Sequence, residues 1–177
     1  MRCVVTSLLA VWMLTASPSW AGWCPLSDRA CGIVGLPSAV VEGIIVVESG
    51  GNPWALHVGI GKGYAFYPRS PAEARRLLAV SLALTDNVDI GLMQINWRTW
   101  RESVRALGLD AYDLLDARIN MEMGCRVLAQ ALSGRGPFLA RLGRYHSLRP
   151  ERGRWYARRV MAAARDVAKG GADVPVR

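Results

Sequence analysis

Glu48 ends an apolar stretch within the segment IIVVESGGNP, which runs from Ile44 to Pro53. If this stretch is a helix, the residues three, four and seven positions earlier lie on the same face, and they are Ile45, Ile44 and Val41. The carboxyl therefore shares the face that should turn towards the core. Burial and the negative end of the helix dipole both raise the pKa of a carboxyl. A glutamic acid in this state can donate a proton near neutral pH.

Other polar residues lie in two later segments, NVDIGLMQINW and LGRYHS. Gln94 and Tyr145 are directional polar groups suited to a mostly apolar groove. We interpret Asn96 as a cap or brace of the following turn. Asp89 is the nearest rival carboxylate, and we interpret it as a structural cap at a helix start. The simpler alternative for Glu48 is an exposed glutamate before an ordinary Gly-Gly helix end.

Helices are the main elements expected to position these residues. The pattern predicts helices over residues 35–49, 70–84, 116–132 and 153–168. Pro37 and Gly50 fit the start and end of the first helix. Ser70 and Glu73 form a capping box for the second, and Asp116 is a cap for the third.

A short β signal is confined to residues 63–68. The chain is therefore expected to be mainly α-helical, with one small β-hairpin.

The first residues have the layout of a secretory signal peptide. Arg2 supplies a positive charge, an apolar run follows, and Ser19-Trp20-Ala21 is a small-residue cleavage pattern. The apolar run is shorter than the ~20 residues of a membrane-spanning helix, so we expect removal after Ala21 rather than anchoring. We predict a signal peptide over 1–21, one domain over 22–165 and a flexible tail over 166–177. An exported protein of this kind has no stable membrane span after cleavage.

Cysteine residues are interpreted as possible disulfides because an exported chain meets an oxidising compartment. Cys24, Cys31 and Cys125 remain after signal removal, and an odd number cannot pair completely. Cys24 or Cys31 can pair with Cys125, or the first two can pair with each other. Cysteine and histidine spacing does not suggest zinc, and we expect neither a metal nor a cofactor.

Positive charge gathers in the last third of the chain, whose formal net charge is +8. A basic face concentrates polyanions. An anionic cell wall or membrane surface suits an exported protein better than nucleic acid, which becomes a candidate only if the signal peptide is unused. A solvated basic helix end is the simpler alternative. The late arginines, opposed nearby by Glu151, are Arg135, Arg141, Arg144, Arg149, Arg152, Arg154, Arg158 and Arg159.

The motif ESGGNP followed by GLMQIN resembles the soluble type of lytic transglycosylase, a family with the lysozyme-like α+β fold. The resemblance continues in LLDARINMEMGCRVLAQAL, which is similar to the family's helix after its L-D/P-x-x-N-I-x-x-G signature. It ends at LGRYHS, where the family usually has A-Y-N. These motifs span roughly residues 30 to 160. Each is short, but their order and spacing together are specific.

The resemblance implies a mechanism with one carboxyl group. Glu48 would protonate the glycosidic oxygen of the N-acetylmuramyl bond and then act as base while the 6-hydroxyl closes a 1,6-anhydro ring. Ser49 would form a hydrogen bond near the acid, Gln94 and the backbone of Met93 would line the glycan groove, and Tyr145 would hold the carboxyl of Glu48. Peptidoglycan in the periplasm would be the substrate.

Two departures from the family pattern are informative. Residues 58–88 form a long insertion, which looks like the transglycosylases that accompany conjugative and type IV secretion machinery and makes such proteins candidate partners. Tyr145 matches the last family motif, but His146 replaces the usual Asn, and its role stays open. Trp54 and Trp97 flank the motifs, where they either stack on sugar rings or pack in the core.

Two further functions compete with this one. A hydrolytic lysozyme similar to the goose type would need a carboxylate such as Asp89 to position water. A scaffold that binds the wall without cleaving it would need neither carboxyl. The joint presence of Glu48, Gln94 and Tyr145 argues against the scaffold.

Overall fold

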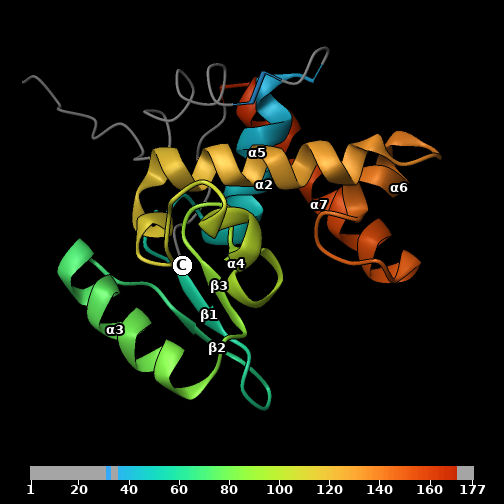
Figure 1. The fold of residues 1–177 in the computed structure, drawn as a ribbon. Coiled ribbons are helices and arrows are strands. Elements are labelled where there is room, and N and C mark those ends of the chain that lie inside the picture. Colours follow the sequence, from blue (N-terminus) through green and yellow to red (C-terminus); the bar gives the residue numbers. More distant parts are fainter. Residues whose placement is uncertain (1–30, 33–35, 171–177) are drawn as a thin grey trace, which may run out of the picture.

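The structure is a computed structural model that describes residues 31–32 and 36–170 (Figure 1). The predicted signal peptide and Cys24 lie outside these residues. Helices predominate, and a small antiparallel sheet accompanies them. The elements in chain order are α2 (Ser38–Ser49), β1 (Leu56–Val58), β2 (Tyr64–Phe66), α3 (Pro71–Leu84), β3 (Val88–Ile90), β4 (Ile95–Asn96), α4 (Trp97–Arg105), η2 (Asp113–Leu115), α5 (Ala117–Ser133), α6 (Phe138–Gly143) and α7 (Pro150–Ala168).

The four predicted helices are confirmed, and their ends have the expected causes. Helix α2 ends where Gly50 takes a left-handed conformation with a φ of 61°. Ser70 caps α3 by accepting a hydrogen bond from the backbone N–H of Glu73. Asp116 caps α5 through the next helical N–H groups. Helix α7 begins earlier than predicted, at Pro150, and continues to Ala168, so residues 166–168 of the predicted tail are helical.

The sheet is larger than the predicted hairpin. Its strands are antiparallel in the order β2-β1-β3-β4, with Leu56 opposite both Phe66 and Ile90. Strands β1 and β2 form the hairpin, whereas β3 and β4 were not predicted. Both lie within NVDIGLMQINW and contain three and two residues. Such short strands show no alternation from which a sheet can be predicted.

Helices α2, α5, α6 and α7 gather on one side of the molecule, and the sheet lies on the other side with α3 at its flank (Figure 1). Helix α2 packs closely on α7, since a Cβ at Gly43 would lie 2.6 Å from the carbonyl oxygen of Val160. A disulfide between Cys31 and Cys125 ties the segment before α2 to α5, which confirms one of the three possible pairings. Among the described residues, no helix has the length and hydropathy needed to cross a membrane.

Candidate active site

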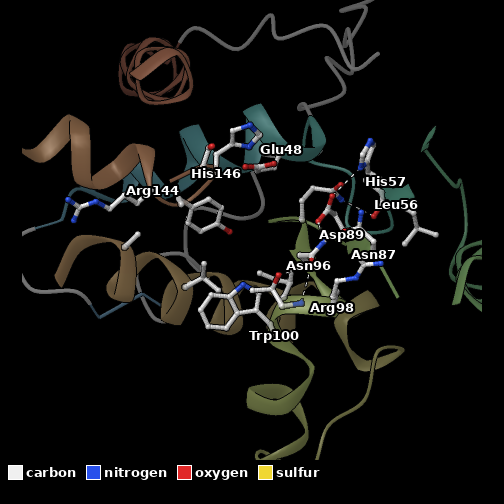
Figure 2. A pocket seen from close by; sticks show the side chains of 18 of the residues that line it. Glu48, Leu56, His57, Asn87, Asp89, Asn96, Arg98, Trp100, Arg144 and His146 are labelled. Carbon is white, nitrogen blue, oxygen red and sulfur yellow. Dashed lines mark hydrogen bonds and ion pairs between the residues drawn. The ribbon is translucent and has the colours of Figure 1, made fainter. Parts of the chain in front are cut away.

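A cleft of about 840 Å³ separates the sheet from the helical side of the molecule. Glu48 and His146 lie along one wall, Trp100 faces them, and Asp89 with His57 lies towards one end (Figure 2). Strands β1, β3 and β4 and helices α4 and α5 supply much of the remaining wall. The lining residues are Glu48, Ala55, Leu56, His57, Ala65, Tyr67, Asn87, Asp89, Gln94, Ile95, Asn96, Arg98, Thr99, Trp100, Val127, Gln130, Ala131, Arg144, Tyr145, His146, Ser147 and Leu148.

Glu48 occupies the last turn of α2 and is half-buried where the helix meets the cleft. Desolvation is the largest cause that raises the pKa of its carboxyl, to about 7 from an ordinary 4.5. The negative charge of Asp89 raises the pKa further, while Tyr156 and the positive charge of Arg159 lower it. The predicted rise in the pKa of Glu48 is thus confirmed, and it occurs even though the positive charge of Arg159 lies near.

This pKa makes Glu48 suitable for transferring a proton in both directions. At pH 7, about half of such carboxyls carry a proton, compared with about 0.3% of those with the ordinary pKa. The group can therefore act as acid in one step and, once ionised, as base in the next. An ordinary surface glutamate is almost always ionised at this pH.

Two stacked tyrosines lie beside Glu48, with their ring centroids 6.1 Å apart. The hydroxyl of Tyr145 donates to the backbone oxygen of Met93 at 2.8 Å. Its one proton is therefore directed at Met93, while the nearby charge of Glu48 helps to raise the pKa of Tyr145, so the role implied for Tyr145 at the carboxyl stays a prediction. Tyr156 also interacts with the carboxyl and lowers its pKa. The contact lies outside ordinary hydrogen-bond geometry, since the buried Tyr156 hydroxyl has no such partner within the described residues.

Tyr156 was missed by the sequence analysis. Burial raises the pKa of both tyrosines well above the ordinary value, so both hydroxyls keep their protons. A signal for Tyr156 was present, because Gly153, Tyr156, Ala157 and Val160 form a buried stripe with helical spacing on α7. A tyrosine on such a stripe carries a polar group into the interior, where it needs a partner.

Ser49 and Asn120 hold the GLMQ segment against the helices. The Ser49 hydroxyl donates to the backbone oxygen of Leu92 at 2.7 Å, directly beside the acid as predicted. Asn120 is fully buried on α5 and accepts from the backbone N–H of Met93 at 2.7 Å. Its amide nitrogen donates to the carbonyls of Ile90 and Leu114. Asn120 was also missed, although a polar residue among apolar helix positions was a usable signal.

Gln94 lines the cleft, as predicted, in an unusual backbone conformation with a φ of 51°. Its side-chain nitrogen donates to the carbonyls of Ala55 and Gly91, which holds the strained residue in place. Met93 is fully buried and is not among the residues that line the cleft. Its backbone N–H and carbonyl are engaged by Asn120 and Tyr145, so its contribution is to support Gln94.

Asp89 lies on strand β3, and the prediction that it caps a helix is wrong. One carboxylate oxygen accepts from the side-chain nitrogen of Asn96 at 2.8 Å, and the other lies 3.1 Å from Nδ1 of His57. Asn96 also caps α4 by accepting from the backbone N–H of Thr99, which confirms its predicted role. This network fixes a negative charge in the same cleft as Glu48.

The aromatic side chains that line the cleft are not the two tryptophans considered in the sequence. Trp97 is buried and Trp54 packs partly buried against the core, so core packing is their role. Trp100 and Tyr67 line the cleft instead. His146 also lines it, and partial burial lowers the pKa of its imidazole. No group of three or more potential metal ligands occurs in the described part of the chain.

Comparisons with known proteins agree with this geometry. The family model described as the transglycosylase SLT domain matches residues 27–159. No match to a curated protein or to a solved structure was found. The matched region contains the acid, the GLMQ segment and the tyrosines around them. The chain therefore belongs to the transglycosylase SLT domain family, the lytic transglycosylases of the lysozyme-like type that act on peptidoglycan.

Proposed function

We propose that this protein cleaves the β-1,4 bond between N-acetylmuramic acid and N-acetylglucosamine, with Glu48 as the catalytic acid and base. The observation that carries the proposal is a glutamate with a pKa of about 7 in the wall of a long cleft. A catalytically silent scaffold has no need of such a costly group. Most glycosidases use two carboxyls, whereas one suffices when the attacking hydroxyl belongs to the sugar.

The proposed reaction balances with Glu48 as the proton carrier. Protonated Glu48 donates to the glycosidic oxygen as the bond from that oxygen to C1 of the muramyl residue breaks. The 6-hydroxyl oxygen of the same muramyl residue attacks C1, and its proton passes to the Glu48 carboxylate. The product has a 1,6-anhydro end, and the enzyme returns to its starting protonation state. Gln94 and Trp100 line the cleft where they can contact the sugars.

A specific observation favours a second candidate, hydrolysis. Asp89 lines the same cleft, and each of its oxygens keeps a lone pair after the contacts with Asn96 and His57. It can therefore position a water molecule, and the product would then have a reducing end. In the lyase reaction Asp89 would instead act through its charge, which raises the pKa of Glu48.

The deciding experiment compares the wild-type protein with Glu48→Gln on purified peptidoglycan and identifies the sugar ends by mass spectrometry. We expect anhydromuramyl ends from the wild type and a loss of about 10²–10⁴-fold in rate for the variant. Glu102→Gln is the matched control, because this glutamate is 83% exposed. Reducing ends that disappear in Asp89→Asn would establish the hydrolase. Wall binding without cleavage would establish the scaffold.

We further propose that the activity opens the wall locally in the periplasm for the assembly of a secretion or conjugation apparatus. The support is the signal-like sequence of residues 1–21 and the insertion over 58–88, which contributes strand β2 and helix α3. Fractionation of cells with a C-terminally tagged chain tests the location. A cytoplasmic protein of unprocessed mass would contradict the proposal.

A further inference from the structure

A second hollow of about 390 Å³ adjoins the catalytic cleft at the start of α7. It is lined by His146, Glu151, Arg152 and Trp155. His146 lines both this hollow and the cleft, so the two adjoin at this side chain. A substituent on a glycan strand that lies in the cleft can therefore enter the hollow.

Trp155 presents a fixed aromatic surface in this hollow. The residue is 54% exposed, which is unusual for the largest apolar side chain. The Arg159 guanidinium lies over its ring at 4.9 Å, and the His146 ring approaches it at 6.5 Å. His146 in turn stacks at 4.8 Å on Tyr156, the tyrosine beside the catalytic acid. An exposed aromatic ring held between neighbours in this way is suited to ligand contact.

The charges at the hollow are available to a ligand. Within the described ranges, no ion pair involves Arg152, Arg159 or Glu151. The hollow therefore presents a guanidinium from Arg152, a carboxylate from Glu151 and the aromatic ring of Trp155 together. A short peptide that carries carboxylates and a free amino group has the complementary chemistry. The stem peptides of peptidoglycan, attached to the muramyl lactyl group, are peptides of this kind.

We propose that this hollow is a subsite for the stem peptide and that the enzyme acts preferentially on peptide-bearing glycan. Arg152 binds a stem carboxylate, Trp155 packs on the apolar part of the peptide, and Glu151 faces the amino group. The inference rests on the proposed function, since the glycan strand must occupy the cleft. If the basic start of α7 acted only through its general positive charge, it would attract every anionic wall polymer. It would then not distinguish glycan that carries stem peptides from glycan that lacks them.

The test compares kcat/KM on glycan strands that carry stem peptides with kcat/KM on the same strands after an amidase has removed the stems. For the wild type we expect a ratio of about ten, the size of one charge-assisted contact. In Arg152→Gln the ratio should fall to about one. Arg154→Gln is the matched control, because it removes the same charge from an exposed position about 200° around the same helix.

Three results would overturn the subsite. A wild-type ratio of one shows that the stem is not recognised. Equal losses in Arg152→Gln and Arg154→Gln show general electrostatic attraction. A preference that survives in both Arg152→Gln and Trp155→Ala places stem recognition elsewhere in the molecule.

Failure of the proposed function is distinguishable from failure of the subsite by a binding measurement. A soluble muramyl peptide is titrated into the wild type and Arg152→Gln while tryptophan fluorescence is recorded. Binding about tenfold weaker in the variant supports the subsite even if the wild type cleaves no glycan. Equal affinities refute it whatever the catalytic result.

Discussion

Replacing Glu48 by Gln should stabilise the folded protein at neutral pH, even though it removes the proposed catalytic group. The reason is that the folded state holds a proton on Glu48 more tightly than the unfolded chain does. The pKa is about 7 in the folded protein and 4.5 as the ordinary value. Ionisation therefore favours the unfolded chain, and glutamine, which does not ionise, avoids this cost.

The magnitude follows from these two values. At pH 7, the carboxyl is almost fully ionised in the unfolded chain and about half ionised in the folded protein. This difference lowers the free energy of unfolding by about 3 kcal/mol relative to a side chain that does not ionise. The contribution of Glu48 is fully present below pH 4.5 and is lost as the pH rises through about 7. Because part of the side chain stays open to the cleft, we discount the expected gain at pH 7 to about 1–3 kcal/mol.

Urea denaturation at a series of pH values from 4 to 8, followed by circular dichroism, measures this gain. The difference between Glu48→Gln and the wild type should be near its minimum at pH 4 and should increase to its full size by pH 8. Glu102→Gln, at an exposed site, should change stability by less than about 0.5 kcal/mol throughout. A difference for Glu48→Gln that stays constant from pH 4 to 8 would refute the assignment of Glu48 as a desolvated acid.

Three other substitutions test the surroundings of the acid. Asp89→Asn removes a negative charge that raises the pKa of Glu48. In a pH–rate profile, the alkaline limb of the activity should therefore move to lower pH. An unmoved profile would contradict the electrostatic contact between the two carboxyls. Asn120→Ala removes three buried hydrogen bonds and should lower the free energy of unfolding by at least about 3 kcal/mol in urea, whereas a loss below 1 kcal/mol would contradict this network. Gly43→Ala places a Cβ against the backbone of Val160 and should lower the thermal midpoint, and an unchanged midpoint would show that α2 and α7 separate easily.

The sequence predicted the elements that carry strong local signals. Ser70 and Asp116 cap the helices that their positions indicated, and Glu48 lies on the inward face because the apolar residues before it recur with helical spacing. Strand β3 was not predicted, since three residues around Asp89 show no usable periodicity. Because this strand was not predicted, Asp89 was interpreted as a helix cap, whereas it lies on β3 and lines the cleft.

Local sequence patterns also could not predict contacts between residues that are distant in the sequence. The hydroxyl of Tyr145 reaches Met93 across 52 positions, and no spacing rule distinguishes this acceptor from Glu48. Tyr156 faces the acid because α7 packs on α2, a contact that becomes visible once Gly43 is seen against Val160. The type of each residue indicated its chemistry, but the packing of helices decided its partner.

The pKa of Glu48 is set from both sides of the cleft. Asp89, on the sheet, raises the pKa, while Tyr156 and Arg159, on α7, lower it, and desolvation requires that both sides stay close. A group that gives and then takes back a proton works best with a pKa near the working pH. The contacts that hold the sheet against the helices, among them the Ser49 hydrogen bond to Leu92, therefore help to set the pKa of Glu48. A substitution that weakens these contacts should admit water to the carboxyl. The pKa of Glu48 should then fall under conditions in which the protein is still folded.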